Sequence, residues 1–167
     1  EMIIEILLKK YGYDNNKKKC LELGVGTGAV IISLSKEMKN WICIGTDISK
    51  KALKVARKNN KRLSTNVIFK QHDWLHNWNE SYDILISNPP YLKSEEYHKS
   101  MVDPKVALVE PSYLYFYKEI QKKQHLFKHI ILEISSTISV QQYLQIFPLA
   151  FIYYDLQGHA RILEIIK

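Results

Sequence analysis

The sequence is poor in the features that mark special protein classes. Its 167 residues include only two cysteines, Cys20 and Cys43, too few for a disulfide framework or a zinc site. It has no apolar run near the roughly 20 residues of a membrane span, and the longest, 2–8, is interrupted by Glu5. Hydrophobic residues make up 46% and charged residues 25%, which argues against a disordered chain, a collagen or a coiled coil. We therefore expect one globular domain in a reduced compartment, with no membrane contact.

Acidic residues are also missing from one particular segment. Lysine and arginine number 24 against 17 acids, a net charge of +7. The excess gathers at Lys17–Lys19 and in the segment from Lys50 to Arg62, which has seven basic residues and no acid. A basic balance favours an acidic partner such as nucleic acid. A solvated helix face is the more common reason for such a run, and both interpretations stay open.

Short apolar runs alternate with longer stretches of helical period, which is typical of a parallel α/β sheet. The pattern predicts strands at 19–23, 41–46, 67–70, 82–87 and 130–134, then two hairpin arms at 149–156 and 161–166. It predicts helices at 1–11, 27–38, 50–61, 113–127 and 139–147, with a loop at 92–112. Ser49 is expected to cap the third helix. The apolar faces expected for the second and third helices are Ala29, Val30, Ile32 and Leu34, and Ala52, Leu53, Val55 and Ala56. We expect an α/β, Rossmann-like fold: a mostly parallel seven-stranded sheet with a C-terminal antiparallel β-hairpin and helices on both faces.

A glycine-rich loop follows the first expected strand and opens a helix. Residues 22–28 read Glu-Leu-Gly-Val-Gly-Thr-Gly, and glycines let the backbone turn tightly and approach a ligand closely. The Gly-x-Gly-x-Gly spacing is shorter than the form that holds a pyrophosphate, and it suits S-adenosylmethionine, whose amino-acid end needs a close backbone. We predict that the cofactor-binding residues here are Gly24, Val25, Gly26, Thr27 and Gly28.

Three residues after later strands extend this cofactor site. Asp47 ends the second strand, where a carboxylate accepts hydrogen bonds from both hydroxyls of a ribose. Asp73 and Trp74 follow the third strand, where Trp74 is expected to cover an adenine face and Asp73 to accept from its exocyclic amine. The structural alternatives are a helix cap for Asp47 and a core aromatic for Trp74.

The most specific feature is the turn Asn88-Pro89-Pro90-Tyr91 at the end of the fourth strand. Proline fixes φ and removes an N–H, so the turn is rigid and its carbonyls are free acceptors. These carbonyls and the Asn88 side-chain carbonyl together offer acceptors for the two hydrogens of a planar NH₂ group. Tyr91 offers a ring face against which the flat substrate can lie. We predict Asn88, Pro89 and Tyr91 as catalytic, Asn88 as a cofactor contact also, and the whole turn as substrate-binding. Positioning and electrostatics suffice for this chemistry, and no metal is needed.

These motifs together resemble class I S-adenosylmethionine-dependent methyltransferases that act on planar NH₂ groups. The chain is most similar to the catalytic domain of the release-factor glutamine methyltransferases, the HemK/PrmC family. The matching stretches cover nearly the whole chain: Glu1 with the helix after it, Leu23–Ala29, Thr46–Ser49 with Ala52, Leu53 and Ala56, Ser87–Tyr91, Asp103–Pro104 with Ala107–Leu108 and Phe116–Lys118, Leu132–Ile134, and Tyr154–Gly158 with Arg161.

The resemblance implies transfer of a methyl group from S-adenosyl-L-methionine to the N5 side-chain nitrogen of the glutamine in the Gly-Gly-Gln motif of a class I peptide-chain release factor. S-adenosyl-L-homocysteine is the other product. We expect residues 1–167 to be the catalytic domain, without the family's N-terminal helical domain, acting as a monomer in the bacterial cytoplasm or an organelle matrix. Two departures are Ser135 in place of the family's usual glycine and Asp103 in place of glutamate.

Two other functions remain open. A methyltransferase acting on an exocyclic amine of a base in RNA or DNA would use the basic segment 50–62 for phosphate contact. A non-catalytic module would keep the fold without binding the cofactor. We expect nucleic acid to be a secondary partner at most.

Overall fold

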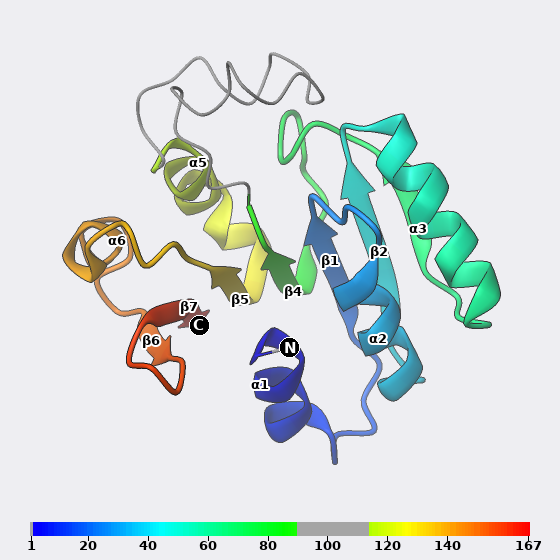
Figure 1. Cartoon of the computed structure of the whole chain (residues 1–167), viewed down its shortest axis with the longest axis horizontal. Helices are drawn as coiled ribbons and strands as arrows, with labels where there is room; N and C mark the ends of the chain where they lie inside the picture. The colour runs from blue at the N-terminus through cyan, green and yellow to red at the C-terminus, as the bar shows by residue number, and fades with distance from the viewer. Residues whose placement is uncertain (1, 90–113) are drawn as a thin grey trace.

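The computed structural model describes residues 2–89 and 114–167, which build a seven-stranded sheet with helices on both faces (Figure 1). The helices are α1 (Met2–Tyr11), α2 (Ala29–Glu37), α3 (Lys50–Arg62), α5 (Tyr115–Lys123) and α6 (Val140–Ile146), with a 3₁₀ turn η2 (Gln124–Leu126) after α5. The strands are β1 (Lys19–Leu23), β2 (Ile42–Asp47), β3 (Ile68–Gln71), β4 (Tyr82–Ser87), β5 (Phe127–Glu133), β6 (Phe151–Tyr154) and β7 (Ala160–Ile166). Among these residues, no helix combines the length and apolarity needed to cross a membrane.

The strand order is β3-β2-β1-β4-β5-β7-β6. The pairings from β3 through β5 are parallel, whereas β7 runs antiparallel between β5 and β6. The predicted mostly parallel sheet with a C-terminal antiparallel hairpin is therefore confirmed. The order reverses between β1 and β4, and open α/β sheets bind ligands at the carboxyl ends of the strands flanking such a reversal.

Each face of the sheet has its own hydrophobic core. One contains Cys20, Cys43 and Ile131 from the strands, together with buried residues of α1, α2 and α3. The other contains strand residues that alternate with these, such as Leu21 and Leu132, together with buried residues of α5 and α6. Buried central strands of this kind explain why the sequence shows short continuous apolar runs. Both cysteines are free and buried, as predicted.

Local signals in the sequence account for several element ends. Ser49 caps α3, since its hydroxyl accepts a hydrogen bond from the Ala52 N–H at 3.2 Å, as predicted. In contrast, Val55 was expected on the buried face of this helix and is 45% exposed. Each residue of an α-helix is rotated by about 100° from the one before it, so Val55, two residues after Leu53, points away from the buried stripe that Leu53 and Ala56 form. Ala29, expected on the apolar face of the preceding helix, is exposed for a similar reason.

The predicted boundary between helix 113–127 and strand 130–134 is wrong. Helix α5 ends at Lys123, and β5 already begins at Phe127. Within β5, Phe127 and His129 are buried and Lys128 is exposed, a period of two residues that is typical of a strand. The sequence conceals this because histidine looks polar, while its partner Glu164 lies 35 residues away.

Candidate functional site

The predicted motifs gather where the strand order reverses. Parallel pairing aligns Leu23 with Thr46 of β2 on one side and with Ser87 of β4 on the other. The next residues along the three strands are Gly24, Asp47 and Asn88. The glycine loop, the acid and the start of the proline turn are thus brought to one edge of the sheet, although 64 residues separate Gly24 from Asn88.

The glycine loop has the backbone of a close ligand contact. Gly24, Gly26 and Gly28 have φ of 69°, 52° and 79°, values that favour glycine over any residue with a Cβ. A Cβ at Gly24 or Gly26 would meet nothing within 4 Å, whereas at Gly28 it would lie 2.9 Å from Ile32 and 3.2 Å from Ala56. The first two glycines therefore leave open space beside the backbone, and the third allows tight packing of α2 against α3. This arrangement fits the amino-acid end of S-adenosylmethionine.

Asp47 links the glycine loop to the start of α3. One carboxylate oxygen accepts from the Gly26 N–H at 2.9 Å, and the other from the Ser49 N–H at 2.8 Å. A carboxylate has about four acceptor positions, so two bonds to the backbone leave capacity for others. These two bonds hold the half-buried side chain in place, and the one from Ser49 is the Asx-type contact of a helix start.

Glu22 has a role that the sequence analysis did not assign. The N-cap residue of helix α2 is Gly28, which has no side chain to cap the helix, and the first turn contains no acid. The buried Glu22 carboxyl group accepts from the Ile31 N–H at 2.9 Å and so replaces the missing cap. Burial raises the pKa of Glu22 to about 8, although the hydrogen bond from Ile31 acts to lower it. The one sequence signal that could have found this residue is an acid two positions before the first glycine of the loop.

A hollow of about 360 Å³ lies next to Asp47, beyond the ends of β2 and β3. It is lined by Ile48, Gln71, His72, Asp73, His76 and Asn77. The His72 N–H donates to the Asp47 carbonyl at 3.2 Å, which joins this hollow to the acid. Asp73 is exposed in its wall and is available to a ligand. The position fits the adenine end of the same cofactor.

Trp74 lies beside this hollow and packs inward. It has a φ of 38° and its ring meets Phe116 edge-on, with centroids 4.7 Å apart. It is half-buried against the core under α5. The ring of Trp74 thus packs toward the core and is not among the residues that line the hollow, and whether one ring face contacts adenine stays a prediction.

Two hydroxyl groups tie the site strands together. The Ser87 hydroxyl donates to the Leu23 carbonyl at 2.8 Å, and the Thr46 hydroxyl to the Glu22 carbonyl at 3.3 Å. Both hydroxyls are buried. They fix the end of β1, from which the glycine loop emerges, to the ends of both neighbouring strands.

The proline turn is described only at its start. Asn88 is exposed and Pro89 is buried, so the asparagine is presented to solvent from a fixed base. Pro90 and Tyr91 lie outside the described residues, as do Asp103 and the other motif positions of the segment 90–113.

Comparison with known proteins agrees with this geometry. A family model described as "Methyltransferase small domain" matches residues 2–109, well over half of the chain. The "Release factor glutamine methyltransferase" of Lactococcus lactis subsp. lactis is 36% identical over 116 residues, covering 70% of this chain and 42% of that protein. A "Putative protein N5-glutamine methyltransferase" of Methanocaldococcus jannaschii is 38% identical over 94 residues, covering 56% and 47%. The chain spans less than half the length of the curated relatives it matches.

Solved structures agree on the fold. TrmN from Thermus thermophilus superposes with a TM-score of 0.67 at 14% identity, over 99% of this chain and 48% of that one. Magnesium protoporphyrin IX methyltransferase (ChlM) from Synechocystis, solved with bound S-adenosylmethionine, gives 0.67 at 15% identity, over 98% and 75%. At such low identity these likenesses show a shared Rossmann-like methyltransferase fold. With the family match over residues 2–109, they lead to one conclusion: the chain belongs to the methyltransferase small domain family.

Proposed function

We propose that this chain transfers a methyl group from S-adenosylmethionine to the N5 nitrogen of the glutamine in the Gly-Gly-Gln motif of a class I release factor. The similarity to proteins named release factor glutamine methyltransferases supports the substrate. One structural observation carries the proposal: Asn88 follows Ser87, whose hydroxyl is bonded to the residue just before the glycine loop. An acceptor for the amide and a cradle for the cofactor therefore lie on neighbouring strands.

In this proposal, Gly24 to Gly28 hold the amino-acid end of the cofactor, Asp47 the ribose, and Asp73 with Trp74 the adenine. The bound cofactor supplies an electrophilic methyl group on a sulfonium. An amide nitrogen is a poor nucleophile because its lone pair is delocalised. The Asn88 side-chain carbonyl accepts a hydrogen bond from the amide and orients the lone pair, while the rigid backbone from Pro89 supplies a second acceptor. The new N–CH₃ bond would replace the S–CH₃ bond of the cofactor, and the amide nitrogen would release one proton to water. Pro90 and Tyr91 complete the substrate contact.

We further propose that residues 1–167 act as a single catalytic domain and as a monomer, in the bacterial cytoplasm or an organelle matrix where release factors work. A methyltransferase for an exocyclic amine in RNA or DNA is the second candidate. The basic helix α3 favours it, since phosphate contact requires exposed cations.

The test incubates the protein with labelled S-adenosylmethionine and two substrates in parallel, a purified class I release factor and total RNA. Mass spectrometry then locates the methyl group. We expect a gain of one methyl on the glutamine of the Gly-Gly-Gln motif, formed roughly 100-fold or more slowly by the Asn88→Ala variant. Label on RNA with none on the release factor would support the second candidate instead. Transfer to neither, with cofactor binding intact, would contradict both.

A further inference from the structure

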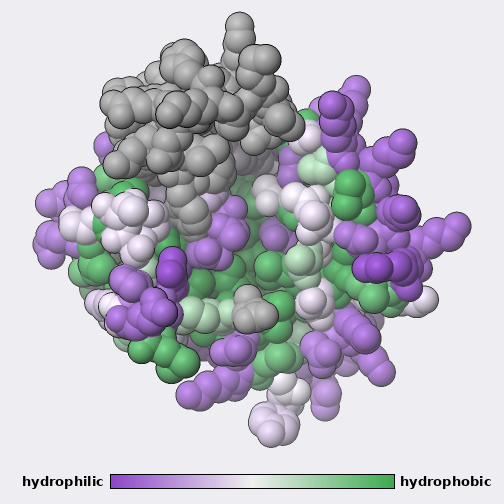
Figure 2. All heavy atoms as spheres, in the orientation of Figure 1, coloured by the Kyte–Doolittle hydropathy of each residue, from purple (hydrophilic) through white to green (hydrophobic). Residues whose placement is uncertain are grey.

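Helix α3 carries a charge equal to that of the whole chain. Its 13 residues include five lysines and two arginines, and these seven charges equal the formal net charge of +7, so the rest of the sequence balances to zero. All seven side chains are exposed, and none pairs with an acid elsewhere in the described residues. Figure 2 shows hydrophilic side chains gathered over α3, at the right of the molecule. Such a concentration of unneutralised charge is suited to an external anion.

The helix is fixed flat against the sheet, so only its outer face is free. Leu53 and Ala56 are buried in the core beneath it. On its flanks, the Asn60 amide donates to the Val67 carbonyl at 3.2 Å and Arg57 donates to the Phe69 carbonyl at 3.0 Å. At 1.5 Å per residue, the 13 residues form a straight basic ridge about 20 Å long.

This ridge lies away from the proposed amide site. Helix α3 packs against β2 and β3, and β1 and β2 separate β3 from β4, at whose end Asn88 lies (Figure 1). A partner on the outer face of α3 therefore does not occupy the place of the reacting glutamine. The ridge needs an explanation separate from the methyl transfer.

We propose that the outer face of α3 binds the phosphate backbone of double-helical RNA. Lysine is depleted at protein–protein interfaces and is a common phosphate contact, which favours nucleic acid over an acidic protein. The helix has no aromatic side chain on which the bases of a single strand would stack. Helix α3 lies flat against the sheet and offers a single exposed face, and the wide, shallow minor groove of A-form RNA can lie across such a face. Contact is with phosphates, so no base sequence is selected.

The test measures binding of a labelled RNA duplex of about 20 base pairs by fluorescence anisotropy, between about 50 and 200 mM salt. The variant is the triple change Lys51→Gln, Lys54→Gln and Lys58→Gln, on exposed positions of the ridge. For the wild type, we expect the logarithm of the binding constant to fall linearly with the logarithm of the salt concentration. In the variant the affinity at low salt should drop roughly tenfold or more, and the slope should decrease by about 2 to 3, because fewer counterions are released.

The matched control replaces three exposed lysines outside α3 by glutamine as well: Lys9→Gln, Lys17→Gln and Lys39→Gln. It has the same net charge as the ridge variant and should bind like the wild type. An equal loss in both variants, or no binding by the wild type at low salt, would overturn the proposal. Equally tight binding of a B-form DNA duplex would overturn the choice of RNA.

The protein alternative is distinguished by a second measurement. If α3 docks an acidic release factor, the ridge variant raises the KM for that substrate while RNA binding stays unchanged, which would overturn the proposal. Val55, exposed on α3, gives a further check, because Val55→Ser removes an apolar contact of use to a protein partner and should leave RNA affinity as it is. The binding assay needs no methyl transfer, so its outcome does not depend on the proposed function.

Discussion

Two polar clusters lie at opposite ends of the same sheet, and they differ in what their groups bond to. At the carboxyl end, Asp47 accepts from Gly26 of the glycine loop, a Cβ on Gly24 or Gly26 would meet only open space, and Asn88 is exposed at the end of the neighbouring strand. At the amino end, His129 of β5 and Glu164 of β7 are each 1% exposed and contact other side chains of the chain. The first cluster has acceptor capacity left for a ligand, whereas the second uses its capacity internally.

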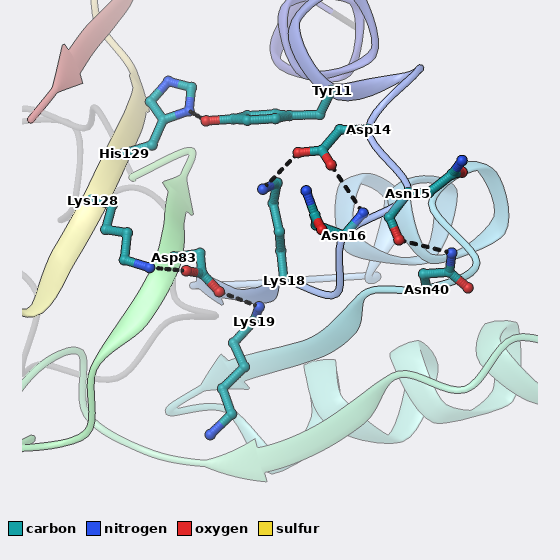
Figure 3. A network of polar contacts seen from close by, with 10 residues as sticks. All are labelled: Tyr11, Asp14, Asn15, Asn16, Lys18, Lys19, Asn40, Asp83, Lys128 and His129. Atoms are coloured by element: carbon teal, nitrogen blue, oxygen red, sulfur yellow. Dashed lines mark hydrogen bonds and ion pairs between the residues drawn. The ribbon is translucent and has the colours of Figure 1, made fainter.

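The amino-end cluster, formed by His129 and Glu164 with Tyr11, Lys10 and Tyr153, fastens α1 to the sheet. The Tyr11 hydroxyl donates to His129 Nδ1 at 3.0 Å, and His129 Nε2 donates to Glu164 at 2.7 Å (Figure 3 shows the first of these contacts). Glu164 also accepts from Lys10 at 3.2 Å and from Tyr153 at 2.6 Å. One carboxylate thus receives three side-chain donors from three elements. The lesson is that a buried polar network with every partner inside the chain indicates stability, and one with spare acceptors indicates a site.

The largest effect we expect is on stability, from Glu164→Ala. Removing the carboxylate leaves three donors without their acceptor, two of them from buried or half-buried side chains. The free energy of unfolding should fall by about 3 kcal/mol, which thermal unfolding measures. Cofactor affinity of the folded protein should not change. The control is Glu5→Ala at an exposed position of α1, which should have little effect on stability. A loss of cofactor affinity in folded Glu164→Ala would contradict a purely structural role for the amino-end cluster.

The next effect is on turnover, from Asn88→Ala. Loss of one preorganised acceptor for the substrate amide should lower kcat by roughly 100-fold or more. Because Asn88 is exposed, the melting temperature should stay close to that of the wild type. Steady-state methylation of the release factor tests this, and near-normal turnover would remove Asn88 from the mechanism.

Asp47→Ala should weaken cofactor binding by about 10- to 100-fold, because hydrogen bonds to a charged group contribute about 1.5 to 3 kcal/mol. Calorimetric titration with S-adenosylhomocysteine measures this. Asp83→Ala is the matched control: this carboxylate accepts from the Lys19 N–H at 2.8 Å at the other end of β1 and bonds Lys128 (Figure 3). It should leave the affinity unchanged. An equal loss in both variants would place the ribose elsewhere.

A smaller, divided effect is expected from the two hydroxyl ties. Ser87→Ala frees the end of β4 and should lower kcat several-fold, and Thr46→Val frees the end of β2 and should weaken cofactor binding to a similar degree, at about 1 kcal/mol for each bond. Steady-state kinetics with both substrates varied separates the two. If each variant only lowers the melting temperature, the ties are structural and do not position the site.

The smallest effect is a pH dependence of opposite sign at the two ends. Burial lowers the pKa of His129 from 6.5, although Glu164 acts to raise it, so this group destabilises the fold as pH falls below about 6.5. Burial raises the pKa of Glu22 from 4.5 to about 8, so its contribution to stability is lost as pH rises between these values. Thermal unfolding at several pH values should show that His129→Gln loses less stability than the wild type as pH falls. It should also show that Glu22→Gln loses less stability than the wild type as pH rises toward 8. An unchanged profile in either variant would contradict the assignment.

Most of the fold follows from local pattern. Buried strands show as short apolar runs, and Ser49 shows as a cap because its hydroxyl reaches the Ala52 N–H within its own turn. The fifth strand was predicted to start at residue 130, three residues after its true start at Phe127, because the burial of His129 depends on Glu164, a residue distant in sequence. Periodicity alone also misplaced Val55 by assigning too wide a buried face to α3.

The sequence by itself determined the candidate residues of the site, because glycines, an acid after a strand and a rigid Asn-Pro-Pro turn each have a chemistry that depends on residue type. Only the tertiary structure decided which groups meet. The tie from Ser87 to Leu23 and the bond from His129 to Glu164 join positions 64 and 35 residues apart, and the cap from Glu22 joins β1 to the helix beyond the glycine loop. Such bonds depend on strand order and register, which arise when the two cores form and leave no local mark in the sequence.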